Sequence, residues 1–106
     1  MTLVRVCTTA EIPEGDARRF QVDGRLIAIA NCGDEGFRAV DAICSHAHYF
    51  LDEGEVDCDL GTIECPKHGS TFDLETGKPK TLPATVPVAA YSVKVEGDEI
   101  SIEVTP

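Results

Sequence analysis

Tryptophan is absent from this chain of 106 residues, and its aromatic residues are only two Tyr and four Phe. The hydrophobic fraction is 42%, so the sequence can still bury an apolar core. With so few aromatic side chains, we expect that core to consist mainly of Val, Ile, Leu and Ala. A chain of this length is typical of a single domain, because too few residues remain for a second core.

Long apolar runs are also missing. No stretch approaches about eighteen consecutive apolar residues, the length from which a membrane-spanning helix is considered. The first six residues, MTLVRV, lack the basic region and the long apolar segment of a secretory signal. We therefore expect a soluble protein of the cytoplasm that does not bind membranes.

Basic residues are scarce as well: nine Lys and Arg stand against nineteen Asp and Glu, for a formal net charge of −10. Nucleic acids and anionic lipids repel such a surface, so we expect neither as a partner. The charge suits a protein partner with a basic surface. It is equally compatible with a role in solubility alone.

Two short runs combine cysteine with histidine: Cys44-Ser45-His46, and Cys65-Pro66-Lys67-His68 further on. Thiolates and imidazoles are good ligands for zinc and for iron, and each run places one of each within four residues. Together the two runs can supply four ligands to one metal site. A structural zinc site and an iron–sulfur site both fit, and colour separates them, because the iron–sulfur protein is brown.

The same residues resemble the ligand pattern of Rieske [2Fe–2S] proteins, in which two cysteines and two histidines hold the cluster. The stretch HGSTFDLETGK at residues 68–78 also resembles that family's HGxxFDxxTGK pattern. The resemblance to small soluble Rieske ferredoxins extends from Val6 to Val104. It implies one [2Fe–2S] cluster per chain, with Cys44 and Cys65 on one iron and His46 and His68 on the other.

The third histidine, His48, lies two residues after a ligand position, and the Cys-x-His spacing favours His46 over it. High-potential relatives of the family tie their ligand loops with a disulfide between positions that correspond to Tyr49 and Lys67. They also have a hydrogen-bonding tyrosine where this chain has Phe72, whereas Ser70 matches their serine. The chain therefore resembles the soluble ferredoxin type.

Three further cysteines, Cys7, Cys32 and Cys58, are not claimed by the ligand pattern. In a reducing compartment we expect them to be free thiols. Asp57 and Asp59 disfavour a thiolate at Cys58 by charge repulsion, so we expect Cys58 to be structural or inert.

Short alternating segments separated by turns predict an all-β domain. Residues 20–29 and 91–104 are typical hairpins with turns at Asp23-Gly24 and Gly97-Asp98. Residues 43–82 are richer in Gly, Asp and Pro and are expected to be mostly loop. The resemblance implies a single Rieske domain over residues 1–106, an antiparallel β barrel or sandwich into which residues 43–82 are inserted as a cluster-binding subdomain.

The resemblance also implies the function of a one-electron carrier between a flavoprotein reductase and a terminal non-heme iron oxygenase. The chain is too short to hold both the cluster and a catalytic pocket with a second metal, so we expect no enzymatic activity, and we expect a monomer. Two alternatives stay open. One is a ferredoxin that serves iron–sulfur cluster assembly, and the other is the small subunit of a nitrite reductase, a Rieske-like fold that often lacks the ligands.

Overall fold

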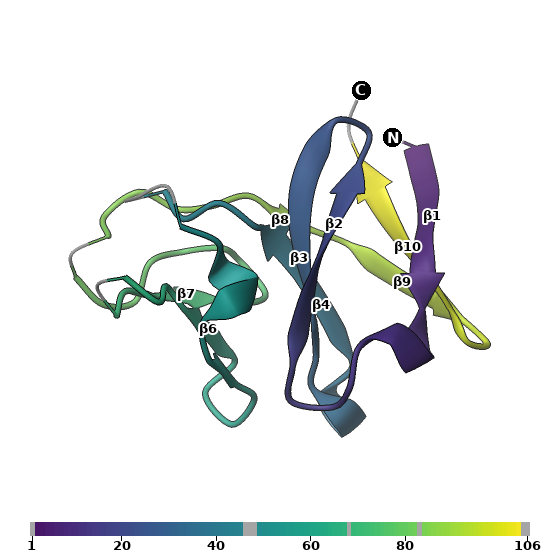
Figure 1. Cartoon of the computed structure of the whole chain (residues 1–106), viewed down its shortest axis with the longest axis horizontal. Helices are drawn as coiled ribbons and strands as arrows, with labels where there is room; N and C mark the ends of the chain where they lie inside the picture. The colour runs from purple at the N-terminus through teal and green to yellow at the C-terminus, as the bar shows by residue number, and fades with distance from the viewer. Residues whose placement is uncertain (1, 46–48, 68, 83, 105–106) are drawn as a thin grey trace.

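The computed structural model describes residues 2–45, 49–67, 69–82 and 84–104, which form ten β-strands and three short 3-10 helices (Figure 1). All strand pairs in this part of the chain are antiparallel, so the all-β prediction is confirmed. No helix among these residues is long or apolar enough to span a membrane. The strands are β1 (Thr2–Thr8), β2 (Ala17–Val22), β3 (Arg25–Asn31), β4 (Phe37–Asp41), β5 (Val56–Asp57), β6 (Thr62–Glu64), β7 (Thr71–Asp73), β8 (Ala90–Tyr91), β9 (Val93–Glu96) and β10 (Glu99–Val104), and the 3-10 helices are η1 (Thr9–Glu11), η2 (Gly33–Glu35) and η3 (Leu51–Glu53).

Two sheets form the base of the molecule, on the right in Figure 1. One has the strand order β1-β10-β9 and the other β2-β3-β4-β8. In β10, every second side chain is buried, as expected for a strand with one face on a core. The hydrophobic cluster between the sheets contains Ile27 and Ile29 of β3 together with Ile100 and Ile102 of β10.

β3 lies between two cores. Ile27 and Ile29 belong to the cluster between the two base sheets, whereas Ala28 and Ala30 belong to a second cluster on the other face of the strand. A strand that is buried on both faces reads as a continuous apolar run rather than as an alternating one. This explains why the sequence of β3 is apolar from Leu26 to Ala30.

A third sheet, with the strand order β5-β6-β7, lies between β4 and β8 in the sequence and on the left in Figure 1. Its side chains Ile63 and Phe72 are fully buried in the second cluster, together with Leu51 and Leu74. Residues 43–82 are thus more regular than expected. These strands have two or three residues each, too few for alternation to be visible in the sequence.

The first strand of the hairpin predicted over residues 91–104 is divided between two sheets. Tyr91 pairs with Ala39 of β4, whereas Val93 pairs with Ile102 of β10. Asp41, at the end of β4, holds this crossing, because its carboxylate accepts hydrogen bonds from the Tyr91 hydroxyl at 2.6 Å and the Ala89 N–H at 3.0 Å. Alternation continues through the crossing, so the sequence pattern does not reveal it.

The expectation of free thiols is wrong for two of the three remaining cysteines. Cys32, just after β3, forms a disulfide with Cys58, in the turn between β5 and β6, and their Cα atoms are 5.3 Å apart. Their sequence separation of 26 hides a proximity that only the folded chain creates. Cys7 is free and buried, and burial, with a smaller contribution from Glu11, raises the pKa of its thiol to about 11.

Candidate metal centre

The first ligand loop follows β4 and begins at Cys44. The backbone N–H of Cys44 donates to the carbonyl oxygen of Tyr49 at 2.9 Å, which closes a loop of six residues. An antiparallel bridge between Ile43 and Phe50 flanks this bond on its outer side. The loop therefore projects from a two-stranded stem, with the cysteine at its foot.

The second ligand loop connects β6 to β7 and has the same closure. The N–H of Cys65 donates to the carbonyl oxygen of Ser70 at 2.7 Å, again five residues along the chain. Inside it, Gly69 adopts a φ of +77° and donates its N–H to the Cys65 carbonyl at 3.1 Å. Residues with a side chain rarely adopt this left-handed backbone conformation, which accounts for glycine at the position.

Both cysteine side chains point into one apolar interior. Cys44 is 3% exposed and Cys65 is fully buried, neither is in a disulfide, and both belong to the hydrophobic cluster that contains Phe72. The fold thus brings together two cysteines from separate loops, as the ligand pattern requires. Among the described residues, no set of three or more His, Cys, Asp or Glu side chains is placed to hold a metal ion.

The three histidines, His46, His48 and His68, lie outside the described residues. The assignment of His46 and His68 as ligands, and of His48 as a non-ligand, therefore stays a prediction.

The buried hydroxyl group of Ser70 is evidence that the site holds a bound group. Its side chain is fully buried, and its Oγ accepts the Ala84 N–H at 3.0 Å. Within the part of the chain that the structure describes, its own hydrogen has no acceptor. Buried hydroxyls usually donate as well as accept, and a sulfur atom held between the loops fits as the acceptor. The residues present therefore fit an iron–sulfur cluster.

The returning segment, residues 84–88, links the two loops on its way back to the base. Its first N–H bonds to Ser70 of the second loop, and the Val86 carbonyl accepts the hydroxyl of Ser45 in the first loop. Further on, Val88 donates its N–H to the Gly77 carbonyl at 2.9 Å. Sequence reasoning assigned no role to Ser45, because a serine between two ligands has no distinguishing signal.

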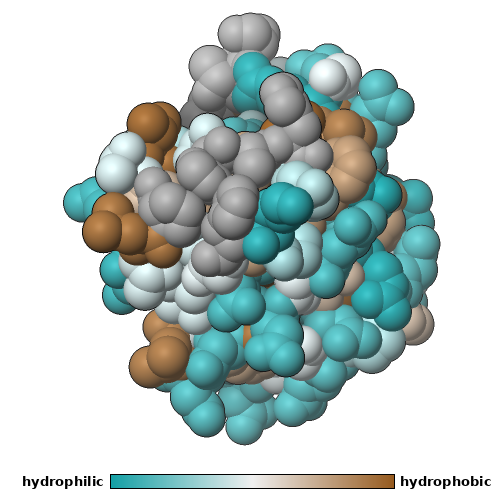
Figure 2. Space-filling view, turned by 60° about the vertical axis from the view of Figure 1, so that its left-hand side comes forward, coloured by the Kyte–Doolittle hydropathy of each residue, from teal (hydrophilic) through white to brown (hydrophobic). Residues whose placement is uncertain are grey.

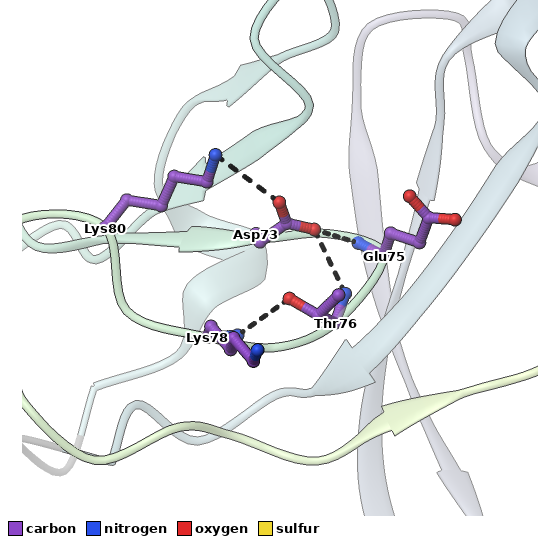
Figure 3. A network of polar contacts seen from close by, with 5 residues as sticks. All are labelled: Asp73, Glu75, Thr76, Lys78 and Lys80. Carbon is purple, nitrogen blue, oxygen red and sulfur yellow. Dashed lines mark hydrogen bonds and ion pairs between the residues drawn. The ribbon is translucent and has the colours of Figure 1, made fainter.

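The FDxxTGK part of the matched motif builds a turn rather than a ligand site (Figure 3). The Asp73 carboxylate accepts the N–H groups of Glu75 and Thr76 at 2.8 and 3.0 Å, and Lys80 lies 3.5 Å from its other oxygen. Burial raises the pKa of Asp73, but these two N–H groups and Lys80 lower it by more, so the net pKa lies below its usual value. The carboxylate is therefore charged at neutral pH and fixes the chain after β7.

At Gly77 in the same motif, the backbone of the turn lies against the backbone of the returning segment. A Cβ atom at this position would lie 2.0 Å from the Val88 carbonyl oxygen, and φ is +79°. Only glycine permits this approach, which places the returning segment against the turn.

Arg19 of β2 connects the base to the first ligand loop. Its guanidinium carbon lies 3.6 Å from the centroid of the Phe50 ring, at the stem of the loop. Its Nη1 also lies 3.8 Å from Glu53 Oε2 and 3.9 Å from Asp52 Oδ1 in η3. We call these four residues the Arg19 clamp.

Asp52 depends on this clamp. Its side chain is only 11% exposed, and Oδ1 is buried without a hydrogen-bond partner among the described residues. Burial raises the pKa of Asp52, and Arg19 opposes that shift. Arg19 is thus the charge partner that makes a buried carboxylate tolerable near the loop stem.

Tyr49 and Lys67 connect the two loops directly. The Lys67 ammonium lies 5.5 Å from the centroid of the Tyr49 ring, within the range of a cation–π contact. The resemblance described above matches these two positions to the extra disulfide cysteines of the high-potential relatives. A weak, non-covalent contact therefore stands in this chain where those relatives have a covalent bond.

Apolar side chains are exposed around the loops. Leu82 is 77% exposed and Val86 59%, and Ile43 and Tyr49 are exposed as well. Figure 2, which turns the left-hand part of Figure 1 forward, shows separate hydrophobic side chains amid pale and hydrophilic ones. Apolar side chains scattered in this way are normal on a protein surface and do not by themselves mark a docking site.

Comparison with known proteins identifies similar chains over nearly the whole length. Residues 2–92 match the family model of the Rieske [2Fe-2S] domain. The 3-phenylpropionate/cinnamic acid dioxygenase ferredoxin subunit of Escherichia coli (strain K12) is 42% identical over 103 residues, which are 97% of this chain and 94% of that protein.

Solved structures give the same result. The ferredoxin of carbazole 1,9a-dioxygenase from Nocardioides aromaticivorans IC177 has a TM-score of 0.90 and 40% identity, covering 96% of this chain and 97% of that one. A chain from a complex of reduced oxygenase and oxidized ferredoxin in carbazole 1,9a-dioxygenase has a TM-score of 0.83 and 34% identity, covering 94% of this chain and 91% of that one.

The clamp generates a first prediction. We expect Arg19→Ala to lower the free energy of unfolding at neutral pH by about 1–3 kcal/mol, because it leaves the Asp52 charge buried without a partner. The folded pKa of Asp52 lies above its unfolded value of about 3.9. Protonation therefore favours the folded state as the pH falls through the folded pKa, and the loss should shrink in acid. Urea denaturation at several pH values measures both effects.

Arg18→Ala is the matched control, since it removes the same charge from an exposed pair with Asp16. It should lower the free energy of unfolding by about 0.2–1 kcal/mol, with a smaller pH dependence than Arg19→Ala, because Arg18 has the smallest of the effects that shift the pKa of Asp52. Adding Asp52→Asn to Arg19→Ala should restore part of the loss. Equal costs for the two arginines would show that the clamp is not what holds the loop.

Proposed function

Because the chain belongs to the Rieske [2Fe–2S] family and resembles its soluble, oxygenase-associated ferredoxins, we propose that it carries single electrons from a flavoprotein reductase to a terminal non-heme iron oxygenase. The observation that supports this most is the 42% identity to a dioxygenase ferredoxin subunit over 97% of the chain. The relatives described above favour an oxygenase system over cluster assembly and over nitrite reduction.

The family has one [2Fe–2S] cluster per domain, and we infer its ligands in this chain. Cys44 and Cys65 bind one iron and His46 and His68 the other. The burial of both cysteines in one interior supports the first pair, and the motif spacing supports the second. The bound cluster supplies the capacity to take up and release one electron.

The ligands and the residues around the cysteines determine how much free energy it costs to add that electron. Two neutral ligands in place of two thiolates leave the oxidised site near zero charge, so an added electron costs less. The Ser70 hydroxyl donates toward a sulfur and stabilises the reduced state. Phe72, fully buried in the same cluster, offers no second donor and excludes water instead.

Residues 43–82 are, in this proposal, the cluster-binding subdomain of a single Rieske domain over residues 1–106. The β5-β6-β7 sheet and the hydrophobic cluster around Cys44 and Cys65 support that division. The rest of the chain is the base on which both ligand loops stand.

Docking takes place at the end of the molecule that carries the ligand loops. Exposed Leu82 and Val86 provide apolar contact there, and the net charge of −10 attracts partners with basic surfaces. One similar structure is a complex of an oxygenase with a ferredoxin, which supports an oxygenase partner. We propose a monomeric carrier of the cytoplasm without substrate chemistry and without nucleic-acid or membrane partners.

The ligand assignment predicts distinct effects for different cysteines. Cys65→Ser protein should contain less iron, lose the visible absorbance of the cluster and melt at a lower temperature, since metal binding contributes to folding. Cys7→Ala is the control, because Cys7 is also free and buried but lies in the other core. It should keep its iron. Iron content and absorbance in Cys65→Ser equal to those of wild type would refute the site.

The same assay separates the histidines. His46→Ala and His68→Ala should lose the cluster, whereas His48→Ala should keep it.

The charge of Lys67 should raise the reduction potential. At an assumed separation of about 10 Å and an effective dielectric constant of about 40–80, one positive charge favours the reduced site by about 0.4–0.8 kcal/mol, or about 20–40 mV. We therefore expect Lys67→Met to lower the potential by that amount in protein-film voltammetry. Lys67→Arg keeps the charge and should stay near wild type.

Lys94→Met removes the same charge from β9 of the base and is the distance control. It should shift the potential much less than Lys67→Met. A Lys67→Met potential equal to wild type would show that this charge is fully screened.

Ionic strength tests the docking proposal. With the ferredoxin below saturation, turnover of a reconstituted chain of reductase, ferredoxin and oxygenase should fall about tenfold as salt screens long-range attraction. The Debye length shrinks from about 30 Å at 0.01 M to about 10 Å at 0.1 M, so most of the fall should lie in that range. Turnover at saturating ferredoxin should change little. A flat profile below saturation would exclude electrostatic steering.

A further inference from the structure

The disulfide between Cys32 and Cys58 joins the base to the sheet that carries the second ligand loop. Cys32 lies between β3 and η2, and Cys58 lies in the turn between β5 and β6. Among the described residues it is the one covalent cross-link between these two parts beyond the chain itself. Such a bond is unusual for a protein proposed to act in the reducing cytoplasm.

A surface cavity gives access to this bond. It has a volume of about 410 Å³ and is lined by both cysteines, by Glu35 and Arg38 of the base and by Asp59 and Glu75 of the inserted part. Cys32 is 8% exposed and Cys58 is only half-buried. The disulfide therefore lies in the wall of an open cavity rather than in a closed core.

The environment also accommodates the reduced form. The Asn31 carbonyl oxygen lies 3.8 Å from Cys58 Sγ, where it can accept a weak hydrogen bond from a thiol. A reduced Cys58 thiol would thus have a hydrogen-bond acceptor in place.

We propose that Cys32–Cys58 is a reversible thiol–disulfide exchange site whose substrate is a dithiol reductant. A thiolate of the reductant attacks Sγ of Cys58, the more exposed of the two residues, and forms a mixed disulfide while Cys32 leaves as a thiolate. The second thiol of the reductant then attacks the mixed disulfide, so the reductant leaves as its own disulfide. The two cysteines take up two electrons from the reductant and two protons, and an oxidised dithiol reverses the reaction.

Charge selects among reductants. The cavity lining contains one cation, Arg38, and four carboxylates, those of Glu35, Asp59, Asp73 and Glu75. An anionic monothiol such as glutathione is repelled, and it also lacks the second thiol that completes the reaction. A neutral or basic dithiol is favoured.

Opening the disulfide loosens one attachment and leaves others in place. The Arg19 clamp and the hydrophobic cluster around Phe72 still hold the inserted part to the base. The protein should therefore remain folded after reduction, with lower stability and with the turn between β5 and β6 released from Cys32.

The experiment uses the cluster-loaded protein under anaerobic conditions, in buffers with graded ratios of reduced to oxidised dithiothreitol. Iodoacetamide traps free thiols, mass spectrometry locates them, and visible absorbance reports the cluster independently. Cys32 and Cys58 should become labelled together over one transition, and the melting temperature should fall by about 10 °C. Glutathione at an equal thiolate concentration should react at least tenfold more slowly.

The double variant Cys32→Ser/Cys58→Ser should melt like the reduced protein and should not respond to dithiothreitol. Cys7→Ala should respond like wild type. Three results would each overturn the proposal: labelling of both cysteines before any reductant is added, labelling only after denaturation, or labelling without a change in melting temperature. An intact cluster spectrum with any of them would leave the proposed electron-carrier function standing.

Discussion

Two cysteine side chains in one apolar interior set the conditions for the rest of this fold. Cys44 and Cys65 come from different loops, and as thiolates they are stable there only when a metal compensates their charge. Each loop therefore needs its own closure. The identical bond from each cysteine N–H to the carbonyl five residues later provides it. The returning segment and the Arg19 clamp then attach these closed loops to the rest of the chain.

The base meets this requirement through β3. Its alternate residues serve two cores, with bulky Ile27 and Ile29 between the base sheets and small Ala28 and Ala30 on the side of the ligand loops. Small side chains let the inserted part approach the sheet closely. The strand thus packs against both the base and the inserted part. Arg19 adds a polar attachment from the neighbouring strand β2.

The sequence predicted what depends on local pattern and missed what depends on distant contacts. The ligand runs and the hairpin at Gly97 are local signals, because a motif or a turn lies within a few residues. The Cys32–Cys58 pair and the division of the strand after Tyr91 are not local. Each depends on which sheet a neighbouring segment joins. Neither the spacing of the cysteines nor the alternation of apolar residues indicates which sheet that is. The assignment of the ligand histidines rests on the motif alone, since these residues lie outside the described residues.

The cluster and the proposed exchange site at Cys32–Cys58 transfer different numbers of electrons and protons. The cluster exchanges one electron at a time, whereas opening the Cys32–Cys58 bond requires two electrons and two protons. A single electron from the cluster cannot complete that reaction, so the carrier cycle does not open its own cross-link. The state of the disulfide instead follows the dithiol pool around the protein. Electron flow through the cluster and the attachment of the inserted part to the base can therefore respond to different reductants.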